Sequence, residues 1–411
     1  MTGRKKFLYI LILGSLSAIG PLSTDMYLPA FPAIAADLGT TTARVALSLS
    51  SFFIGISFGQ LLYGPVLDRF GRKKPIYFGL LIYLLSSGGC ALATSVDALI
   101  ALRLLQAVGG CAGMVASRAM VRDLFPVEET AKIFSLLVLV IGVSPIIAPT
   151  LGGYVASAWG WHAVFIVLVV LAALLLVAIH FYLPESYKPN VSLSLRPAAI
   201  LKGYRDVLVS PPFYTYALTG ALAGSGLYAY ISGSPVVYME YFDVSQKTYG
   251  LVFAGIAGSL ILSSQLNSLL LRRYRSGQII RIALFCQTGI GLALVVGTYA
   301  GWWGLYETTA LIALFLSSQG FTFPNSSALS LAPFSINAGS ASALMGGMQM
   351  GVGALTSATV SVFTNGSPLP MTMVMAACAL LAFLTLLMGT WRMQRTARKA
   401  DVAEEAVELV P

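Results

Sequence analysis

The stretch that decides the fold is "GPVLDRFGRKKP", residues 64–75, which joins two long apolar segments at 44–64 and 76–95. Each flanking segment has about 20 residues, the length that a helix needs to cross the hydrocarbon core of a bilayer. The connection itself holds Arg69, Arg72 and two lysines. This pattern predicts two membrane-spanning helices joined by a basic loop at the membrane surface.

The composition extends this prediction to the whole chain. Of its 411 residues, 57% are hydrophobic and 10% are charged, whereas a soluble domain carries about 25% charged residues. The mean hydropathy is +0.81. A soluble protein with a very large core is the alternative, and the long uncharged segments disfavour it. We expect an all-α membrane protein with twelve spans, at 7–33, 44–64, 76–95, 98–121, 131–155, 162–183, 212–238, 247–270, 279–300, 305–328, 339–363 and 370–391.

The basic residues predict the orientation of these spans. Of the 25 Lys and Arg residues, all but Arg44, Lys247 and the intramembrane Arg103 fall in segments that are inside when the N-terminus is inside. Both termini are therefore expected in the cytoplasm. The net charge of +9 follows from this asymmetry and gives no reason to expect nucleic acid. The basic, apolar N-terminus resembles a signal peptide, but it lacks a clear cleavage site, so we expect it to remain as the first span.

A polar stretch at 184–210 divides the chain into two sets of six spans. The basic loop at 64–75 has a weak echo in "LLLRRYRSGQ", residues 269–278, after the eighth span. Duplicated six-helix halves are an expected transporter architecture. The predicted units are a first bundle at 1–183, a cytoplasmic linker at 184–210, a second bundle at 211–393 and a solvated, partly disordered tail at 394–411.

Nothing in the sequence predicts an enzyme, a cofactor or a metal site. The four cysteines lie in apolar stretches without metal-ligand spacing, and the two histidines lie near opposite ends of one span. The chain has no dinucleotide fingerprint, no phosphate-binding loop and no nucleophile elbow.

Asp25 lies within the first predicted span, in "PLSTDMYLPAFP", residues 21–32. A carboxylate near the membrane interior costs about 2.5–3.5 kcal/mol or more, so such residues usually have a function. A helix rise of about 1.5 Å per residue puts Asp25 and Arg103, in the fourth span, at one depth. We expect the two to pair, so that Asp25 can take up a proton when its cation leaves. A static ion pair, or side chains that reach toward the outer surface, are the alternatives.

The loop at 64–75 has the spacing G-x-x-x-D-R-x-G-R-K, which is more specific than a basic connection requires. It resembles the signature loop of the major facilitator superfamily of secondary transporters. The resemblance implies two pseudo-symmetric six-helix bundles that rock about a central cavity. We expect a gating role for the loop residues Gly64, Asp68, Arg69, Gly71 and Arg72.

Two further motifs support the resemblance. "LIALRLLQAVGG", residues 99–110, resembles the family's motif around Arg103, and "GVSPIIAPTLGG", residues 142–153, resembles the motif associated with antiporters. An alanine replaces a usual glycine in each. Prolines interrupt helical hydrogen bonds, so the second motif can bend or seal. Its expected functional residues are Pro145, Pro149, Gly152 and Gly153.

The inner end of the fourth span carries Arg118, Arg122 and Asp123. Anchoring at the inner surface explains the arginines, and a gate that pairs with the Asp68 loop is the alternative. Polar side chains within apolar spans are candidates for the substrate site. They are Tyr228, Tyr230, Gln265, Gln319, Asn325 and Gln349.

"STDMYLPAFP" and "SRAMVRDLFP", residues 23–32 and 117–126, resemble the bicyclomycin/chloramphenicol-resistance branch of the drug–proton antiporters. This implies a bacterial inner-membrane exporter that exchanges protons for small apolar or zwitterionic drugs. We expect small-molecule substrate, protons and lipid as its partners, and a monomer. A symporter that imports a metabolite on the same fold, or a membrane sensor that transports nothing, are the rival hypotheses.

Overall fold

The computed structural model describes residues 3–189, 197–334 and 338–408, and all secondary structure in these ranges is helical. Twelve helices there have between 19 and 40 residues. The α-helices are α1 (Gly3–Asp25), α2 (Phe31–Asp37), α3 (Thr42–Phe70), α4 (Lys73–Ala91), α5 (Val96–Leu124), α6 (Val127–Trp159), α7 (Trp161–Tyr182), α8 (Pro197–Leu208), α9 (Pro211–Pro235), α10 (Gln246–Leu270), α11 (Ser276–Tyr299), α12 (Leu305–Leu331), α13 (Ala338–Phe363) and α14 (Leu369–Glu408). A 3₁₀ turn η1 (Leu28–Ala30) follows α1, and a π-helical turn η2 (Val236–Tyr241) follows α9.

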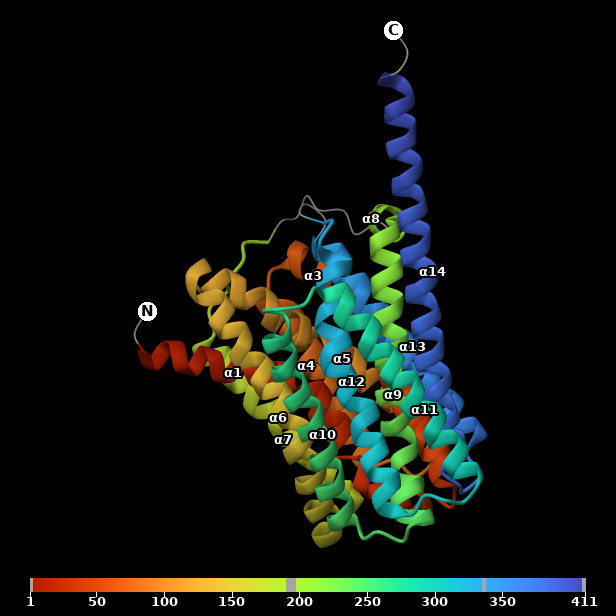
Figure 1. The fold of residues 1–411 in the computed structure, drawn as a ribbon. Coiled ribbons are helices and arrows are strands. Elements are labelled where there is room, and N and C mark those ends of the chain that lie inside the picture. The colour runs from red at the N-terminus through yellow and green to blue at the C-terminus, as the bar shows by residue number, and fades with distance from the viewer. Residues whose placement is uncertain (1–2, 190–196, 335–337, 409–411) are drawn as a thin grey trace.

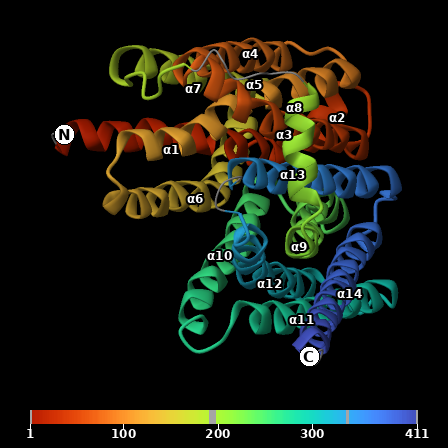
Figure 2. The same ribbon diagram turned by 90° about the horizontal axis from the view of Figure 1, so that it is seen from above.

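The helices form two groups that lie side by side (Figure 2). One group holds α1 to α7, and the other holds α9 to α14. Along their boundary α13 packs against α3, and α6 packs against α10. Helix α14 projects from one end of the bundle, which we call the tail end, and the opposite end is the far end (Figure 1). The arrangement agrees with the expectation of two six-helix bundles.

Short polar side chains line the α3–α13 boundary. The hydroxyl oxygens of Ser50 and Ser357 are 2.9 Å apart, and the Ser57 hydroxyl donates to the Gly347 carbonyl oxygen at 2.8 Å. Small residues of this kind let two helices approach closely. The two halves therefore meet here partly through hydroxyls and backbone, beside apolar contacts such as that of Leu61 with α13.

The first span differs from its prediction. We expected one span over 7–33, but α1 ends at Asp25, and η1 and α2 follow as separate short elements. Pro29 and Pro32 stand in the first turns of η1 and α2, where a proline loses no helical hydrogen bond. In a continuous helix the N–H of residue 29 would bond to the Asp25 carbonyl and that of residue 32 to the Leu28 carbonyl, but a proline has no N–H to give. Together they break the helix immediately after the carboxylate.

Two polar segments also hold more helix than expected. Helix α14 continues through the predicted boundary at 393 to Glu408, where we expected a partly disordered tail. Its last turns are rich in Ala, Arg, Lys and Glu, which are strong helix formers. Helix α8 lies within the predicted linker, at the tail end of the bundle (Figure 1).

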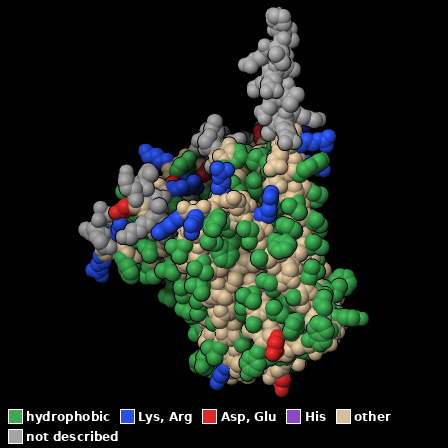
Figure 3. All heavy atoms as spheres, viewed as in Figure 1, with side chains coloured by type: hydrophobic (Ala, Val, Ile, Leu, Met, Phe, Trp, Pro, Cys, Tyr) green, Lys and Arg blue, Asp and Glu red, His purple; other side chains and the backbone are tan. Residues whose placement is uncertain are grey.

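Eight helical segments of the described chain are long and apolar enough to cross a membrane by length and composition. The remaining long helices are α4, α9, α12 and α13. These four helices are rich in Gly, Ser, Thr and Tyr, many of them buried against neighbouring helices. Figure 3 shows hydrophobic side chains over the flank of the molecule and most visible Lys and Arg side chains near the tail end. This distribution is that of a multi-pass membrane protein.

Candidate functional site

Asp25 occupies the helix break and faces the other half of the protein. Its side chain is 4% exposed, and its Oδ1 accepts a hydrogen bond from the Thr24 hydroxyl at 2.9 Å. It is close enough to Tyr228, Tyr230 and Tyr249 to interact with them electrostatically. All three tyrosines belong to the second half, on α9 and α10. The carboxyl group thus lies at the boundary between the two halves.

Arg103 is completely buried within the first half. One of its Nη atoms donates to the side-chain oxygen of Gln106, whose amide nitrogen donates to the Ser87 hydroxyl at 2.7 Å. The guanidinium also lies over the rings of Phe52 and Tyr27, at 4.2 and 4.8 Å from their centroids. Such cation–π contacts partly replace a counter-ion. Nε and Nη2 have no hydrogen-bond partner among the described residues.

The expected ion pair between Asp25 and Arg103 is therefore wrong for this conformation. Within the described ranges no ion pair joins the two side chains. The helix break explains the difference, because the chain turns after Asp25 and places the Tyr27 ring, rather than the carboxylate, over Arg103. The prediction assumed that the helix continued.

The glycine pair of α6 packs directly on the break. A Cβ atom at Gly152 would lie 2.0 Å from the Met26 carbonyl oxygen, so only glycine allows this approach. At Gly153 a Cβ would lie 3.0 Å from the carbonyl oxygen of Gln246, at the start of α10. Helix α6 therefore links the segment beside Asp25 to the second half. It runs unbroken through Pro145 and Pro149.

A further contact joins the halves at the far end. The Thr42 hydroxyl, at the start of α3, donates to the Glu240 carboxylate in the π-helical turn. Together with the α6–α10 packing, this contact holds the two halves against each other beyond Asp25. The far end is closed in this conformation.

The signature loop forms a charged cluster at the tail end. Arg72 is 7% exposed at its side chain; its Nε donates to Asp123 at 2.8 Å and its Nη1 to Asp68 at 2.9 Å. Burial alone would lower the pKa of Arg72, but the two carboxylates raise that pKa above its usual value. All three residues belong to the first half. The cluster therefore ties α3, α4 and α5 together and does not bridge the halves.

Glu185 completes this cluster, although it was not among the predicted site residues. Its carboxylate accepts the backbone N–H of Arg72 at 2.7 Å and that of Lys73 at 3.0 Å, which satisfies the N-terminus of α4. Gly71 has a φ of +84° and faces the same carboxylate. Tyr187 lies under the Arg72 guanidinium, 4.2 Å from ring centroid to Cζ. The only hint in the sequence was that an acidic residue directly follows the sixth span, on the same side of the membrane as the signature loop.

The other predicted gate residues play smaller parts. Asp123 forms an ion pair with Arg72 of the signature loop. This contact was expected if the inner end of the fourth span forms a gate with that loop. Arg118 and Arg122 are exposed, and within the described ranges neither forms an ion pair. Arg69 lies over the Phe70 ring, and the site at Gly64 is open space.

The six candidate substrate residues do not form one group. Tyr228 is wedged between Phe53 of α3, at 4.7 Å between ring centroids, and α13, where its hydroxyl contacts the Met350 sulfur at 3.4 Å. Tyr230 is buried and stacks on Phe253. Both belong to the Asp25 region.

Two of the four predicted amides hold helices of the second half together. Gln319 donates to two backbone carbonyls of α9, and Asn325 donates to the Asn267 side chain at 2.7 Å. These bonds hold α12 to α9 and α10 inside the second half. Gln265 is exposed and Gln349 is half-buried. Among the described residues no cluster of His, Cys, Asp and Glu could hold a metal ion.

The comparisons with known proteins give the family. The sequence profile of the Major Facilitator Superfamily matches residues 13–358. An uncharacterized MFS-type transporter, YdgK of Bacillus subtilis, is 33% identical over 390 residues, which cover 93% of this chain and 95% of the relative. A bicyclomycin resistance protein homolog of Haemophilus influenzae is 31% identical, covering 93% and 96%.

A solved structure has the same fold at low sequence identity. The bacterial homologue of the human lysosomal transporter Spinster, in an inward-facing and occupied conformation, superposes with a TM-score of 0.75. The match covers 95% of this chain and 98% of that one at 15% identity. The fold, the profile and the two relatives together show that this chain belongs to the major facilitator superfamily.

Proposed function

We propose that the protein is a proton-coupled exporter of small drugs, with Asp25 as the group that carries the proton. The observation that supports this most directly is the position of Asp25, buried at a helix break between the two halves. The names of relatives, such as the bicyclomycin resistance protein homolog and a chloramphenicol resistance protein, support drug export. The basic tail end supports a cytoplasmic location for both termini.

The mechanism follows from the surroundings of Asp25. A buried carboxyl group without a cationic partner costs little when it holds a proton and much when it is ionised. Closing the far end over Asp25 therefore requires a proton. When the halves separate at the far end, water reaches the carboxyl and a proton can enter from outside.

Release of the proton requires a compensating positive charge. Arg103 is such a charge, because two of its nitrogen atoms lack hydrogen-bond partners in the described structure. The ring of Tyr27, two residues after Asp25, already lies over its guanidinium. A shift of the broken segment that brings the carboxylate to Arg103 would stabilise the ionised form. The proton would leave toward the tail end, and the substrate would travel the other way.

The residues of the signature loop keep their proposed gating role. The Arg72 cluster fixes α3, α4 and α5 as one unit, so this face of the first half moves as a rigid body. We propose that the protein acts as a transporter without a cofactor and functions as a monomer.

The test compares Asp25→Asn with wild type and with Asp97→Asn. Asp97 is a suitable control because it is an exposed acid at the far end that pairs with Arg44. Cells would be challenged with chloramphenicol and bicyclomycin, and labelled chloramphenicol would be followed in proteoliposomes with an imposed pH gradient. We expect Asp25→Asn to lose uphill extrusion by at least about tenfold, while the control retains it.

Three other outcomes would each contradict the proposal. Full uphill extrusion by Asp25→Asn would remove the proposed proton carrier but leave an exporter. Proton-driven accumulation in the opposite sense would indicate a symporter. No chloramphenicol or bicyclomycin flux under any gradient, with wild-type folding by size-exclusion chromatography, would contradict drug export.

A further inference from the structure

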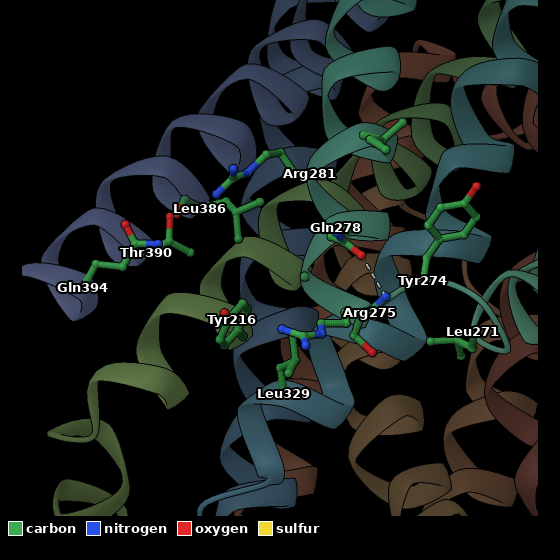
Figure 4. A pocket seen from close by; sticks show the side chains of 13 residues that line it. Tyr216, Leu271, Tyr274, Arg275, Gln278, Arg281, Leu329, Leu386, Thr390 and Gln394 are labelled. Carbon is green, nitrogen blue, oxygen red and sulfur yellow. Dashed lines mark hydrogen bonds between the residues drawn. The ribbon is translucent and has the colours of Figure 1, made fainter. Parts of the chain in front are cut away.

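A second site lies far from Asp25, at the tail end of the second half. A pocket of about 940 Å³ opens there between α9, the α10–α11 turn, α11, α12 and α14 (Figure 4). Its polar lining comes from Tyr216, Arg275, Gln278, Arg281, Thr390 and Gln394. The transport mechanism described above uses none of these residues.

The pocket is positively charged. Arg275 and Arg281 both direct their guanidinium groups into it (Figure 4), and no acidic residue lines it. In the part of the chain that the structure describes, neither arginine forms an ion pair. Two guanidinium groups beside amide and hydroxyl donors are suited to a phosphate, whose oxygens accept charge-assisted hydrogen bonds.

An apolar depression adjoins the charged pocket. This second pocket, about 440 Å³, shares Arg281, Thr390 and Gln394 with the first and is completed by side chains of α14. Leu387, Met388 and Trp391 line it and are 38, 57 and 58% exposed. Exposed apolar residues beside a tryptophan near a helix end are typical of the boundary between acyl chains and headgroups. A ligand that fills both pockets must be an amphiphile.

We propose that this pair of pockets binds one anionic glycerophospholipid, with the phosphate on Arg275 and Arg281 and an acyl chain on Leu387, Met388 and Trp391. The lipid would come from the leaflet at the tail end, which is cytoplasmic in the proposed orientation. Basic pockets between helices at that surface are suited to anionic headgroups. The site lies within the second half, so the lipid anchors that half independently of its partner.

The position of Trp391 provides a direct test. The other four tryptophans lie at the far end, in or beside the α6–α7 and α11–α12 turns. The protein would be reconstituted in phosphatidylcholine vesicles, and brominated phosphatidylglycerol would be added as a quencher. The Trp391 signal is the difference between wild type and Trp391→Phe. Quenching against lipid fraction gives the affinity of phosphatidylglycerol relative to phosphatidylcholine.

The informative variant is the double substitution Arg275→Gln with Arg281→Gln. The matched control is Arg272→Gln with Arg273→Gln, which removes the same charge from the adjoining α10–α11 turn but from residues that do not line the pocket. We expect the relative affinity to fall at least about tenfold in the pocket variant and less than about threefold in the control. Chromatography and circular dichroism would confirm that both variants fold.

Two results would overturn the proposal. Equal losses in the pocket and control variants would mean that only the general charge of this end attracts anionic lipid. Relief of quenching by millimolar inorganic phosphate, with no dependence on the acyl chain, would assign the pocket to free phosphate rather than to a lipid. Neither result depends on whether the protein exports drugs.

Discussion

Removing the hydroxyl of Tyr204 should weaken the attachment of the linker helix to the first half. Its hydroxyl, on α8, donates to the carbonyl oxygen of Leu61 at 2.9 Å. In an unbroken α-helix that carbonyl would accept the N–H of the fourth residue onward. Here that residue is Pro65, inside α3, which has no N–H to give. Tyr204 therefore supplies the donor that the proline lacks.

The expected cost follows from this geometry. A typical protein hydrogen bond contributes about 0.5–1.5 kcal/mol, and a buried carbonyl left without a donor costs about 1–3 kcal/mol. Both Tyr204 and Leu61 are half-buried, so water can partly replace the hydroxyl. We expect Tyr204→Phe to lower the free energy of unfolding by about 1 kcal/mol. Equilibrium unfolding with sodium dodecyl sulfate in mixed micelles would measure it.

The decisive comparison is a double-mutant cycle with Pro65→Ala. Alanine restores the N–H, so the Leu61 carbonyl regains its helical partner and Tyr204 becomes dispensable. Tyr204→Phe should then cost close to zero, giving a coupling energy of about 1 kcal/mol. Tyr214→Phe, the loss of a hydroxyl from a half-buried tyrosine of α9, is the control. An equal cost of Tyr204→Phe with and without Pro65 would refute the reasoning.

The same bond has a defined pH dependence. Burial raises the pKa of Tyr204, which lies outside the membrane spans, above its usual value of 10.0. A group whose pKa is raised by folding stabilises fully below its unfolded pKa and loses that contribution as pH rises through the folded value. The difference between wild type and Tyr204→Phe should thus stay constant from about pH 6 to about pH 9 and shrink only above about pH 10.

Three substitutions test other parts of the structure. Gly152→Ala would place a Cβ 2.0 Å from the Met26 carbonyl oxygen, so α6 must move. We expect the free energy of unfolding to fall by about 1–3 kcal/mol. Chloramphenicol efflux should fall by a larger fraction than the free energy of unfolding does. Glu185→Gln removes the charge that caps α4; it should cost about 0.5–1 kcal/mol and slow turnover, with chloramphenicol binding changed less than about twofold. Asn325→Ala leaves Asn267 without its partner and should cost about 1–3 kcal/mol without changing which drugs are exported.

Each of these substitutions has an outcome that would contradict its expectation, and Gly152→Ala also has a matched control. Gly255→Ala adds the same methyl group to α10 in open space and should be silent. Normal efflux by Gly152→Ala would show that the close packing on the helix break is not needed. Weaker chloramphenicol binding by Glu185→Gln, in proportion to its slower turnover, would count against a gating role. A changed drug spectrum for Asn325→Ala would return that amide to the substrate site.

The sequence was sufficient for the helices and insufficient for their interruptions. Long uncharged segments predict spans because the bilayer leaves few alternatives, and each of the twelve predicted spans overlaps one long helix, although the first also extends over η1 and α2. The break after Asp25 depends on Pro29 and Pro32. A proline is also tolerated in the first turn of a helix, so the two prolines alone did not predict where the first span would be interrupted. Hydropathy does not reveal this break, because Leu28 and Phe31 are as apolar as the helix before them.

The sequence predicted which residues of the site are buried better than it predicted which residues they contact. Intramembrane charge singled out Asp25 and Arg103, and the structure shows both to be buried. Their pairing was inferred from depth alone, and depth says nothing about the direction in which a side chain points. Glu185 was missed for a related reason, because its role is to accept two backbone N–H groups and sequence does not show which helix end a distant carboxylate will reach.

The hydrogen-bonded serines at the α3–α13 boundary affect how easily the two halves can move against each other. Hydroxyl groups rotate freely and both donate and accept, so Ser50 or Ser57 can exchange one neighbour for the next as the helices turn against each other. Interlocked leucines would have to disengage and re-engage, at the cost of transient voids. These exchangeable hydrogen bonds would let the two halves tilt against each other while α3 and α13 stay in contact.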